Sequence, residues 1–213
     1  APRYRAGRIG LPLAAWLLAL GQPGLALVLY QLLCWAGCLA AVFLVARWLE
    51  AEGLPAAWAF LLTLSAGLAT SMLRSTPDGA AVALILAALW WRRQGRPRAE
   101  LGALAAATLV RETSLLAAVA LAFLELRQRR VRAAALRLGV PFAVFAGWRA
   151  ILGLLIEDES RGRIAGNFGI PFAWLPAKLE QIAEMGLPAA RMELAGFLAL
   201  AAGWAVLAAV ALR

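Results

Sequence analysis

The sequence predicts an all-α, polytopic integral membrane protein, a helical bundle with short or re-entrant helices and an interfacial layer on the extracytoplasmic side. Three observations support this prediction. Hydrophobic residues make up 63% of the 213 residues, well above the roughly 45–50% apolar content of soluble domains. Several apolar runs reach the length of about 20 residues that a spanning helix needs. The arginines behind the +9 formal charge are concentrated in short segments between these runs, where they orient a membrane protein.

The apolar runs differ in length and therefore in expected role. The first, Ile9 to Leu20, is short and follows a basic segment, so we expect a helix that lies in the membrane interface without crossing it. Ala80 to Trp91 is also too short for a comfortable span. Four runs are long enough to cross a bilayer: Leu25 to Ala46, Leu54 to Leu73, Leu138 to Ile156 and Leu194 to Leu212.

A pair of opposite charges, Arg111 and Glu112, divides the stretch from Leu101 to Leu124 into two half-runs. Arginine-rich segments flank this stretch at 92–98 and 127–137, and the positive-inside rule favours a cytoplasmic location for both. One continuous helix would separate them, whereas a helical hairpin with its tip at "RET" keeps them on one side. We therefore expect the hairpin, whose tip must be buried in protein or line a wet cavity.

The same orientation places the "RET" tip and "RSTPDG" (74–79) on the extracytoplasmic side. We treat the chain as one membrane domain with four parts. They are an interfacial segment 1–23, a helical core 24–156, an extracytoplasmic loop 157–187 with a short helix from Pro176 to Met185, and a C-terminal membrane helix 188–213.

The composition excludes several kinds of chemistry. The chain has no histidine, so imidazole metal sites and Ser-His catalysis are excluded, and acid–base work must fall to carboxylates. Cys34 and Cys38 lie four residues apart in an apolar run, and we expect small buried side chains rather than a disulfide framework. No P-loop, dinucleotide-binding or zinc-binding motif is present. Nucleic-acid binding is disfavoured because the basic clusters are short segments flanking helices.

Charged residues on the outer side are the candidate functional groups. A charge inside the membrane costs about 2.5–3.5 kcal/mol on insertion scales, so Arg111 and Glu112 indicate function, the alternative being an ion pair that only holds the hairpin tip. Arg74 and Asp78 precede a predicted helix, where Asp78 is also an ordinary capping residue. Further guanidinium groups suited to phosphate, or simply to lipid headgroups, are Arg5, Arg161 and Arg163.

Residues 3 to 155 resemble bacterial polytopic membrane glycosyltransferases of the GT-C superfamily, in the branch associated with cell-surface glycopolymers and polyprenyl-linked sugar donors. The resemblance rests on "YRAGRIGLPLAAWLLALGQP", on the segment from "GLATSMLRSTPDG" through "LVRETSLL", and on the helix ending in "GWRAIL". It implies a GT-C-like bundle in the bacterial cytoplasmic (inner) membrane. Such an enzyme transfers a sugar from a polyprenyl-phosphate donor to an acceptor hydroxyl at the extracytoplasmic face.

The resemblance also implies roles for the candidate residues. A phosphate is already a good leaving group, so one carboxylate base and phosphate-binding cations suffice. Glu112 or Asp78 would orient or deprotonate the acceptor. Arg111 and Arg74 would stabilise charge on the lipid phosphate, with Arg5, Arg161 and Arg163 as further phosphate-binding residues. Carboxylates are also able to hold a divalent metal, although no pattern here requires one.

The sequence departs from the superfamily pattern in three places. The catalytic acid of those enzymes usually follows the first transmembrane helix, but residues 1–23 contain no acid. Val110 stands where the first Thr of a Thr-Arg-Glu-Thr run is expected, and Asp78 follows the proline that related sequences place after the acid. We therefore expect an enzyme if an N-terminal helix and acidic loop exist in the full-length protein.

Two alternatives belong to other functional classes. The first is a non-catalytic integral membrane subunit of a larger complex, derived from a GT-C-like ancestor, whose small residues suit close helix packing. The second is a transporter, which we favour less because transporter sites lie near the bilayer midplane. The charged motifs here are expected at one face of the membrane.

Overall fold

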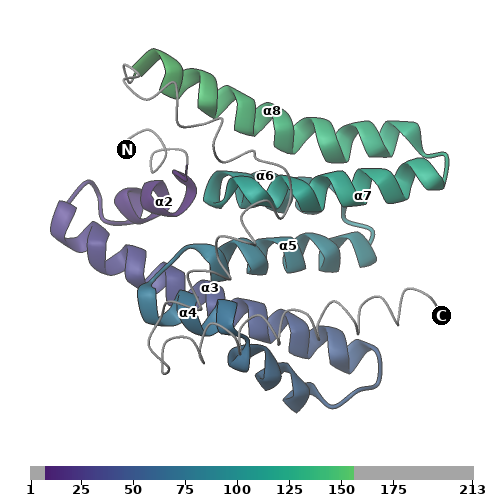
Figure 1. The fold of residues 1–213 in the computed structure, drawn as a ribbon, viewed down its shortest axis with the longest axis horizontal. Helices are drawn as coiled ribbons and strands as arrows, with labels where there is room; N and C mark the ends of the chain where they lie inside the picture. Colours follow the sequence, from purple (N-terminus) through teal and green to yellow (C-terminus); the bar gives the residue numbers. More distant parts are fainter. Residues whose placement is uncertain (1–7, 156–213) are drawn as a thin grey trace, which may run out of the picture. The chain divides into compact units, whose positions relative to one another are not determined.

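The computed structural model describes residues 8–155, and this part of the chain consists of helices joined by short loops (Figure 1). It lies in the first of the two units into which the chain divides, Ala1–Asp158 and Glu159–Arg213. The expected loop 157–187, the short helix from Pro176 to Met185 and the C-terminal membrane helix 188–213 lie outside the described residues.

The helices of the described part are of two kinds, long and short. α3 and α8 have 29 and 25 residues, or lengths of about 44 and 38 Å, and both are long enough and apolar enough to span a membrane. The elements in chain order are α2 (Gly10–Leu18), α3 (Pro23–Ala51), the 3-10 helix η1 (Ala56–Leu64), α4 (Ala66–Arg74), α5 (Asp78–Arg93), α6 (Pro97–Val110), the 3-10 helix η2 (Glu112–Ser114), α7 (Leu115–Arg127) and α8 (Val131–Leu155).

The run from Leu54 to Leu73, expected to be long enough to cross a bilayer, is not one continuous helix. This segment forms η1 and α4, which are bent by 69° relative to each other. Ser65 lies at the bend, where its hydroxyl donates to the carbonyl of Leu62 (2.7 Å) and accepts from the amide of Leu68 (3.4 Å). A serine at this position caps a new helix and so ends the previous one. If the bent pair is one broken span, the described residues contain three candidate spans rather than two.

The hairpin between the two arginine-rich segments is present. α6 ends at Val110, and Arg111 adopts an extended backbone (φ −151°, ψ 123°) before η2 and α7. The chain reverses at this break, because Glu100 near the start of α6 and Glu125 near the end of α7 both contact Arg137 of α8. The two arginine-rich loops therefore lie at one end of these helices and the "RET" tip at the other.

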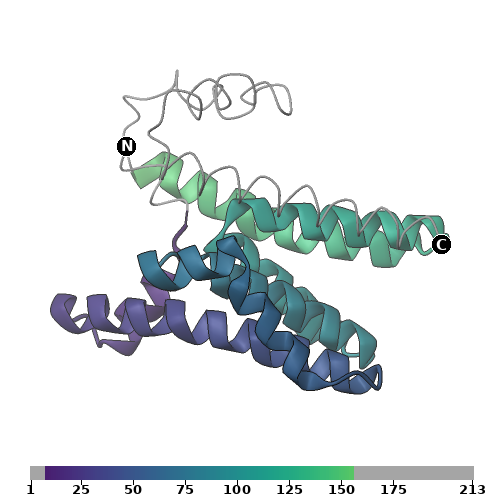
Figure 2. The same ribbon diagram turned by 60° about the horizontal axis from the view of Figure 1, so that its bottom comes forward.

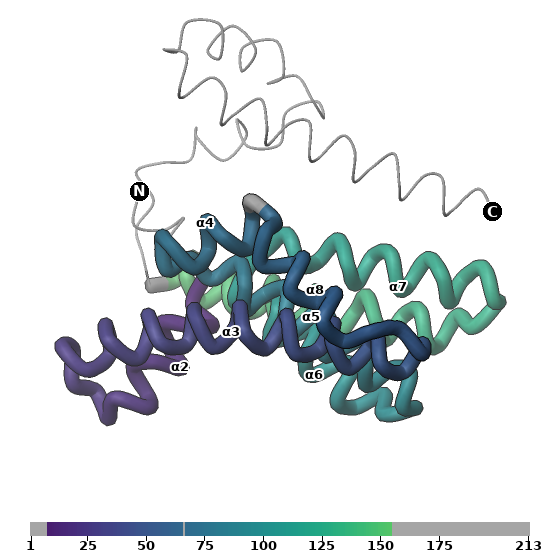
Figure 3. Tube along the Cα trace, turned by 90° about the horizontal axis from the view of Figure 1, so that it is seen from below, coloured from purple at the N-terminus to yellow at the C-terminus, as the bar shows by residue number. Residues whose placement is uncertain are grey.

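α3 and α8 lie on opposite sides of α5 and α6 (Figures 1 and 2), and α2 lies beside the start of α3 (Figure 3). α3 and α5 approach closely because glycines face the contact. A Cβ atom on Gly37 would lie 2.5 Å from the Cα of Ala80, and one on Gly79 would clash with the Sγ of Cys38. Cys34 and Cys38 are buried as free thiols, as expected for small buried side chains.

Candidate functional site

Four charged side chains meet at the hairpin tip, and we call them the tip cluster: Arg8, Asp78, Arg111 and Glu112. Arg8 donates two hydrogen bonds to Glu112, from Nε to Oε2 (3.2 Å) and from Nη2 to Oε1 (3.0 Å). Arg111 forms an ion pair with Asp78. Three segments far apart in the sequence therefore supply the cluster: the residues just before α2, the start of α5, and the break between α6 and α7.

Arg8 reaches Glu112 because α2 begins directly against the end of α6. A Cβ atom on Gly10 would lie 2.9 Å from Cγ2 of Val110 and 3.0 Å from the carbonyl carbon of Leu109. Only glycine allows this approach without displacing the neighbouring backbone. Leu11 and Val110 are buried in one apolar cluster beneath the charges. The tip cluster therefore rests on packed helix ends.

Asp78 is positioned by the tight turn between α4 and α5. Ser75 ends α4 in the left-handed conformation (φ 49°). The buried hydroxyl of Ser71 donates to the carbonyl of Thr76 (2.8 Å) and accepts from the amide of Gly79 (3.0 Å), which closes the turn. The hydroxyl of Thr76 in turn donates to Oδ2 of Asp78 (3.2 Å). One carboxylate oxygen thus faces a hydroxyl and the other faces Arg111.

The tip cluster is partly desolvated but open to solvent, with side-chain exposures of 26% for Arg8, 32% for Glu112, 35% for Arg111 and 34% for Asp78. Burial raises the pKa of the Glu112 carboxyl. Its hydrogen bonds to Arg8 and to its own backbone, together with the charges of Arg8 and Arg111, lower the pKa by more than burial raises it, so the pKa lies below its ordinary value. A carboxylate with a lowered pKa is a weak base. Glu112 is therefore better suited to hold Arg8 than to remove a proton.

The other candidate residues are not part of the tip cluster as described. Arg74 is exposed at the last turn of α4 and forms no ion pair with residues of the described range. Arg5, Arg161 and Arg163 lie outside the described residues. Sequence reasoning did not select Arg8, although the signal was available, because Arg8 stands just before the apolar run that forms α2.

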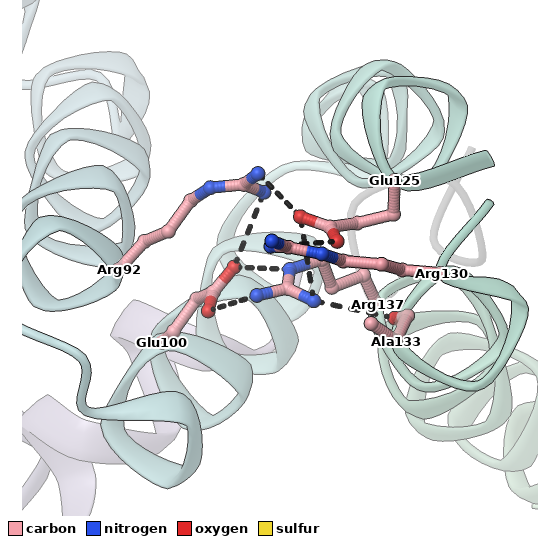
Figure 4. A network of polar contacts seen from close by, with 6 residues as sticks. All are labelled: Arg92, Glu100, Glu125, Arg130, Ala133 and Arg137. Atoms are coloured by element: carbon pink, nitrogen blue, oxygen red, sulfur yellow. Dashed lines mark hydrogen bonds and ion pairs between the residues drawn. The ribbon is translucent and has the colours of Figure 1, made fainter. Parts of the chain in front are cut away.

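A second group of charges, which we call the buried network, lies at the opposite end of the short helices (Figure 4): Arg92, Glu100, Glu125, Arg130 and Arg137. The side chains of Glu100 and Glu125 are only 1% and 2% exposed. Arg137 donates to both oxygens of Glu100, from Nε to Oε1 (2.6 Å) and from Nη2 to Oε2 (2.9 Å). Arg92 donates to Glu125, and its Nη1 lies 3.9 Å from Oε1 of Glu100.

The buried network connects α5, α6, α7 and α8. Each buried carboxylate faces at least two guanidinium groups, since Arg137 and Arg130 also lie near Glu125, at 3.7 and 4.0 Å. Breaking such a pair by removing one partner is strongly destabilising because the remaining charge stays buried. This arrangement suits a structural role that holds the open ends of the hairpin together. Sequence reasoning had assigned these arginines only to the loops and had not selected either glutamate.

Residues 8–155 contain no group of three or more carboxylate, thiol or imidazole side chains arranged to hold a metal ion. Comparisons of the chain with protein-family models, with curated proteins and with solved structures found no match.

Proposed function

We propose that this chain is a membrane glycosyltransferase that moves a sugar from a polyprenyl-phosphate donor to an acceptor at the extracytoplasmic face of the bacterial cytoplasmic membrane. The observation that carries the proposal is the tip cluster, in which two carboxylates and two guanidinium groups from three separate segments converge. They lie at the end of the helices opposite the arginine-rich loops. Charged groups within membrane segments are rare and usually serve a function.

Helix lengths support a position of the tip cluster below the outer membrane surface. α5, α6 and α7 have 16, 14 and 13 residues, or lengths of about 24, 21 and 20 Å. A bilayer has a hydrocarbon core of about 30 Å. If the arginine-rich loops lie at the cytoplasmic surface, the tip ends short of the opposite surface. Charges at that depth need water or protein around them, so we expect a wet recess, which suits a phosphate attached to a lipid.

We assign the base for the acceptor to Asp78 rather than Glu112. The base acts through Oδ2, which accepts a hydrogen bond from the Thr76 hydroxyl, because Oδ1 is buried against Arg111. Both oxygens of Glu112 already accept hydrogen bonds from Arg8, and the pKa of Glu112 is lowered. In the proposed step the acceptor oxygen attacks the anomeric carbon, its proton passes to Asp78, and the lipid phosphate leaves with the electron pair of the broken bond. Arg111, paired with Asp78 and about one-third exposed, would place its positive charge near the departing phosphate.

The test uses the full-length protein in liposomes with a radiolabelled polyprenyl-phosphate sugar and a membrane extract as the source of acceptor. Replacing Asp78 with Asn is expected to lower transfer by about 10²- to 10⁴-fold, the usual contribution of a general base. Glu52→Gln is the matched control, because Glu52 is an arginine-paired carboxylate outside the tip cluster. Absence of transfer to any acceptor by the wild type, or equal transfer by wild type and Asp78→Asn, would contradict the proposal.

One observation favours a second candidate, a non-catalytic subunit of a membrane complex. Each carboxylate of the tip cluster is already paired with an arginine, as in a clamp that only holds the ends of helices together. In that case the wild type transfers no sugar and copurifies with a stoichiometric membrane partner. The Asp78→Asn variant would then lower thermal stability or recovery of the complex.

A further inference from the structure

The arginines at the arginine-rich end of the described helices include two that are bound by buried carboxylates and five that are exposed and unpaired among the described residues. Arg92 and Arg137 point inward and are bound by the glutamates of the buried network. Five others, which we call the outer arginines, are exposed and form no ion pair with carboxylates of residues 8–155. The outer arginines are Arg96, Arg98, Arg127, Arg129 and Arg132. They keep their charges available for a ligand.

The outer arginines come from two loops that the buried network holds at the same end. Arg96 and Arg98 lie at the start of α6, whereas Arg127, Arg129 and Arg132 surround the α7–α8 loop. The bond from Arg92 to Glu125 joins the end of α5 to the end of α7, next to both loops (Figure 4). The buried network therefore holds the two loops in place, and the outer arginines contribute little to that network.

Exposed apolar side chains adjoin the outer arginines. On the α7–α8 side these are Leu124, Leu126, Val131, Leu136 and Leu138. On the α3–α5 side, Trp48 and Trp90 form an edge-to-face pair with ring centroids 5.8 Å apart. Arginine together with tryptophan beside an apolar surface is typical of the membrane–water interface.

We infer that the outer arginines form a binding surface for the headgroups of anionic phospholipids in the adjacent leaflet. Guanidinium groups bind phosphate oxygens through two parallel hydrogen bonds, and the adjoining leucines face the acyl chains of the same lipids. A nucleic acid would leave those leucines exposed to water, which disfavours it as the ligand. The inference requires that the chain lies in a membrane, but it is independent of sugar transfer.

The test measures the lipids retained by the full-length protein after purification from liposomes of phosphatidylglycerol and phosphatidylcholine, by native mass spectrometry. We expect the wild type to retain phosphatidylglycerol preferentially. The double variant Arg127→Gln, Arg129→Gln is expected to lose about fivefold of this preference for each arginine that contacts a headgroup, or about 25-fold for the pair. High salt during purification is expected to weaken the preference of the wild type.

The matched control removes two arginines from the same end whose charges are already paired. Arg47 pairs with Glu50, and Arg93 pairs with Glu52, so Arg47→Gln, Arg93→Gln should retain most of the preference. Equal losses in the two double variants would overturn the inference, because the effect would then reflect net charge. A wild type that does not discriminate between the lipids would also overturn it. So would an RNA homopolymer that displaces bound phosphatidylglycerol.

Discussion

Removing Arg137 is the sharpest perturbation of the buried network. Its guanidinium donates to both oxygens of Glu100 and lies 3.7 Å from Glu125. Replacement by methionine keeps much of the stem but leaves two carboxylates, 1% and 2% exposed, with Arg92 and Arg130 as their remaining cationic partners. Loss of one partner of a buried ion pair costs about 3–5 kcal/mol. We expect Arg137→Met to lower the free energy of unfolding by that amount.

The assay is unfolding of the purified protein in mixed micelles, with increasing denaturing detergent, followed by circular dichroism and by tryptophan fluorescence. Arg47→Gln is the control, because both partners of the Arg47–Glu50 pair are more than half exposed. Exposed ion pairs contribute only about 0–1 kcal/mol. The double variant Arg137→Met, Glu100→Met is expected to recover part of the loss, since a buried pair is often replaceable by packed apolar groups.

The result that would refute this reasoning is a loss of less than about 1 kcal/mol for Arg137→Met, equal to that of Arg47→Gln. Such a result would mean that water or lipid headgroups solvate the two glutamates after the arginine is removed. The buried network would then not hold the hairpin ends, nor would it hold together the two loops that carry the outer arginines.

Three further perturbations test the packing, the electrostatics and the orientation. Gly37→Val is expected to destabilise the protein by about 1–3 kcal/mol through overpacking, whereas Gly102→Val, which meets open space, should cost much less in the same unfolding assay. The pKa of Glu112 is lowered, so ionised Glu112 stabilises the fold above its ordinary pKa near 4.5, and this stabilisation disappears as the pH falls through the lowered pKa. Glu112→Gln should abolish that part of the dependence of stability on pH. In intact cells, an impermeant maleimide should label a cysteine at exposed Thr113 but not at Gln94, in a cysteine-free background.

Hydropathy, together with the positions of proline and glycine, predicted the helices well where their ends depend on local chemistry. α3 and α6 begin at Pro23 and Pro97, where the fixed φ angle of proline suits a first turn. Gly53 and Gly95 follow α3 and α5 with positive φ, as helix-terminating glycines do. The break within the segment from Leu54 to Leu73 was not predicted, because hydropathy records only total apolar content. It carries no information about a single serine that caps a second helix.

The candidate site was predictable only in part, because ion pairs depend on which distant helix ends meet. Orientation reasoning placed Asp78 and Arg111 on the same side, and the structure brings them into contact. Arg8 was missed because its partner lies 104 residues away. Glu100 and Glu125 were missed because acids beside arginine-rich loops usually belong to solvated surfaces. Their burial depends on the packing of α8 against α6 and α7, which no local pattern expresses.

The contrast between the two charged groups bears on their roles. In the buried network the carboxylates are nearly inaccessible, as a structural clamp requires. In the tip cluster all four charged side chains keep 26–35% exposure, and ion pairs open to solvent contribute about 1 kcal/mol or less. A charge at the centre of a membrane helix costs about 2.5–3.5 kcal/mol on insertion scales, which is more than such an exposed pair contributes. Stability alone therefore gives little reason to retain these charges at the tip, which fits the proposed contact with an anionic ligand.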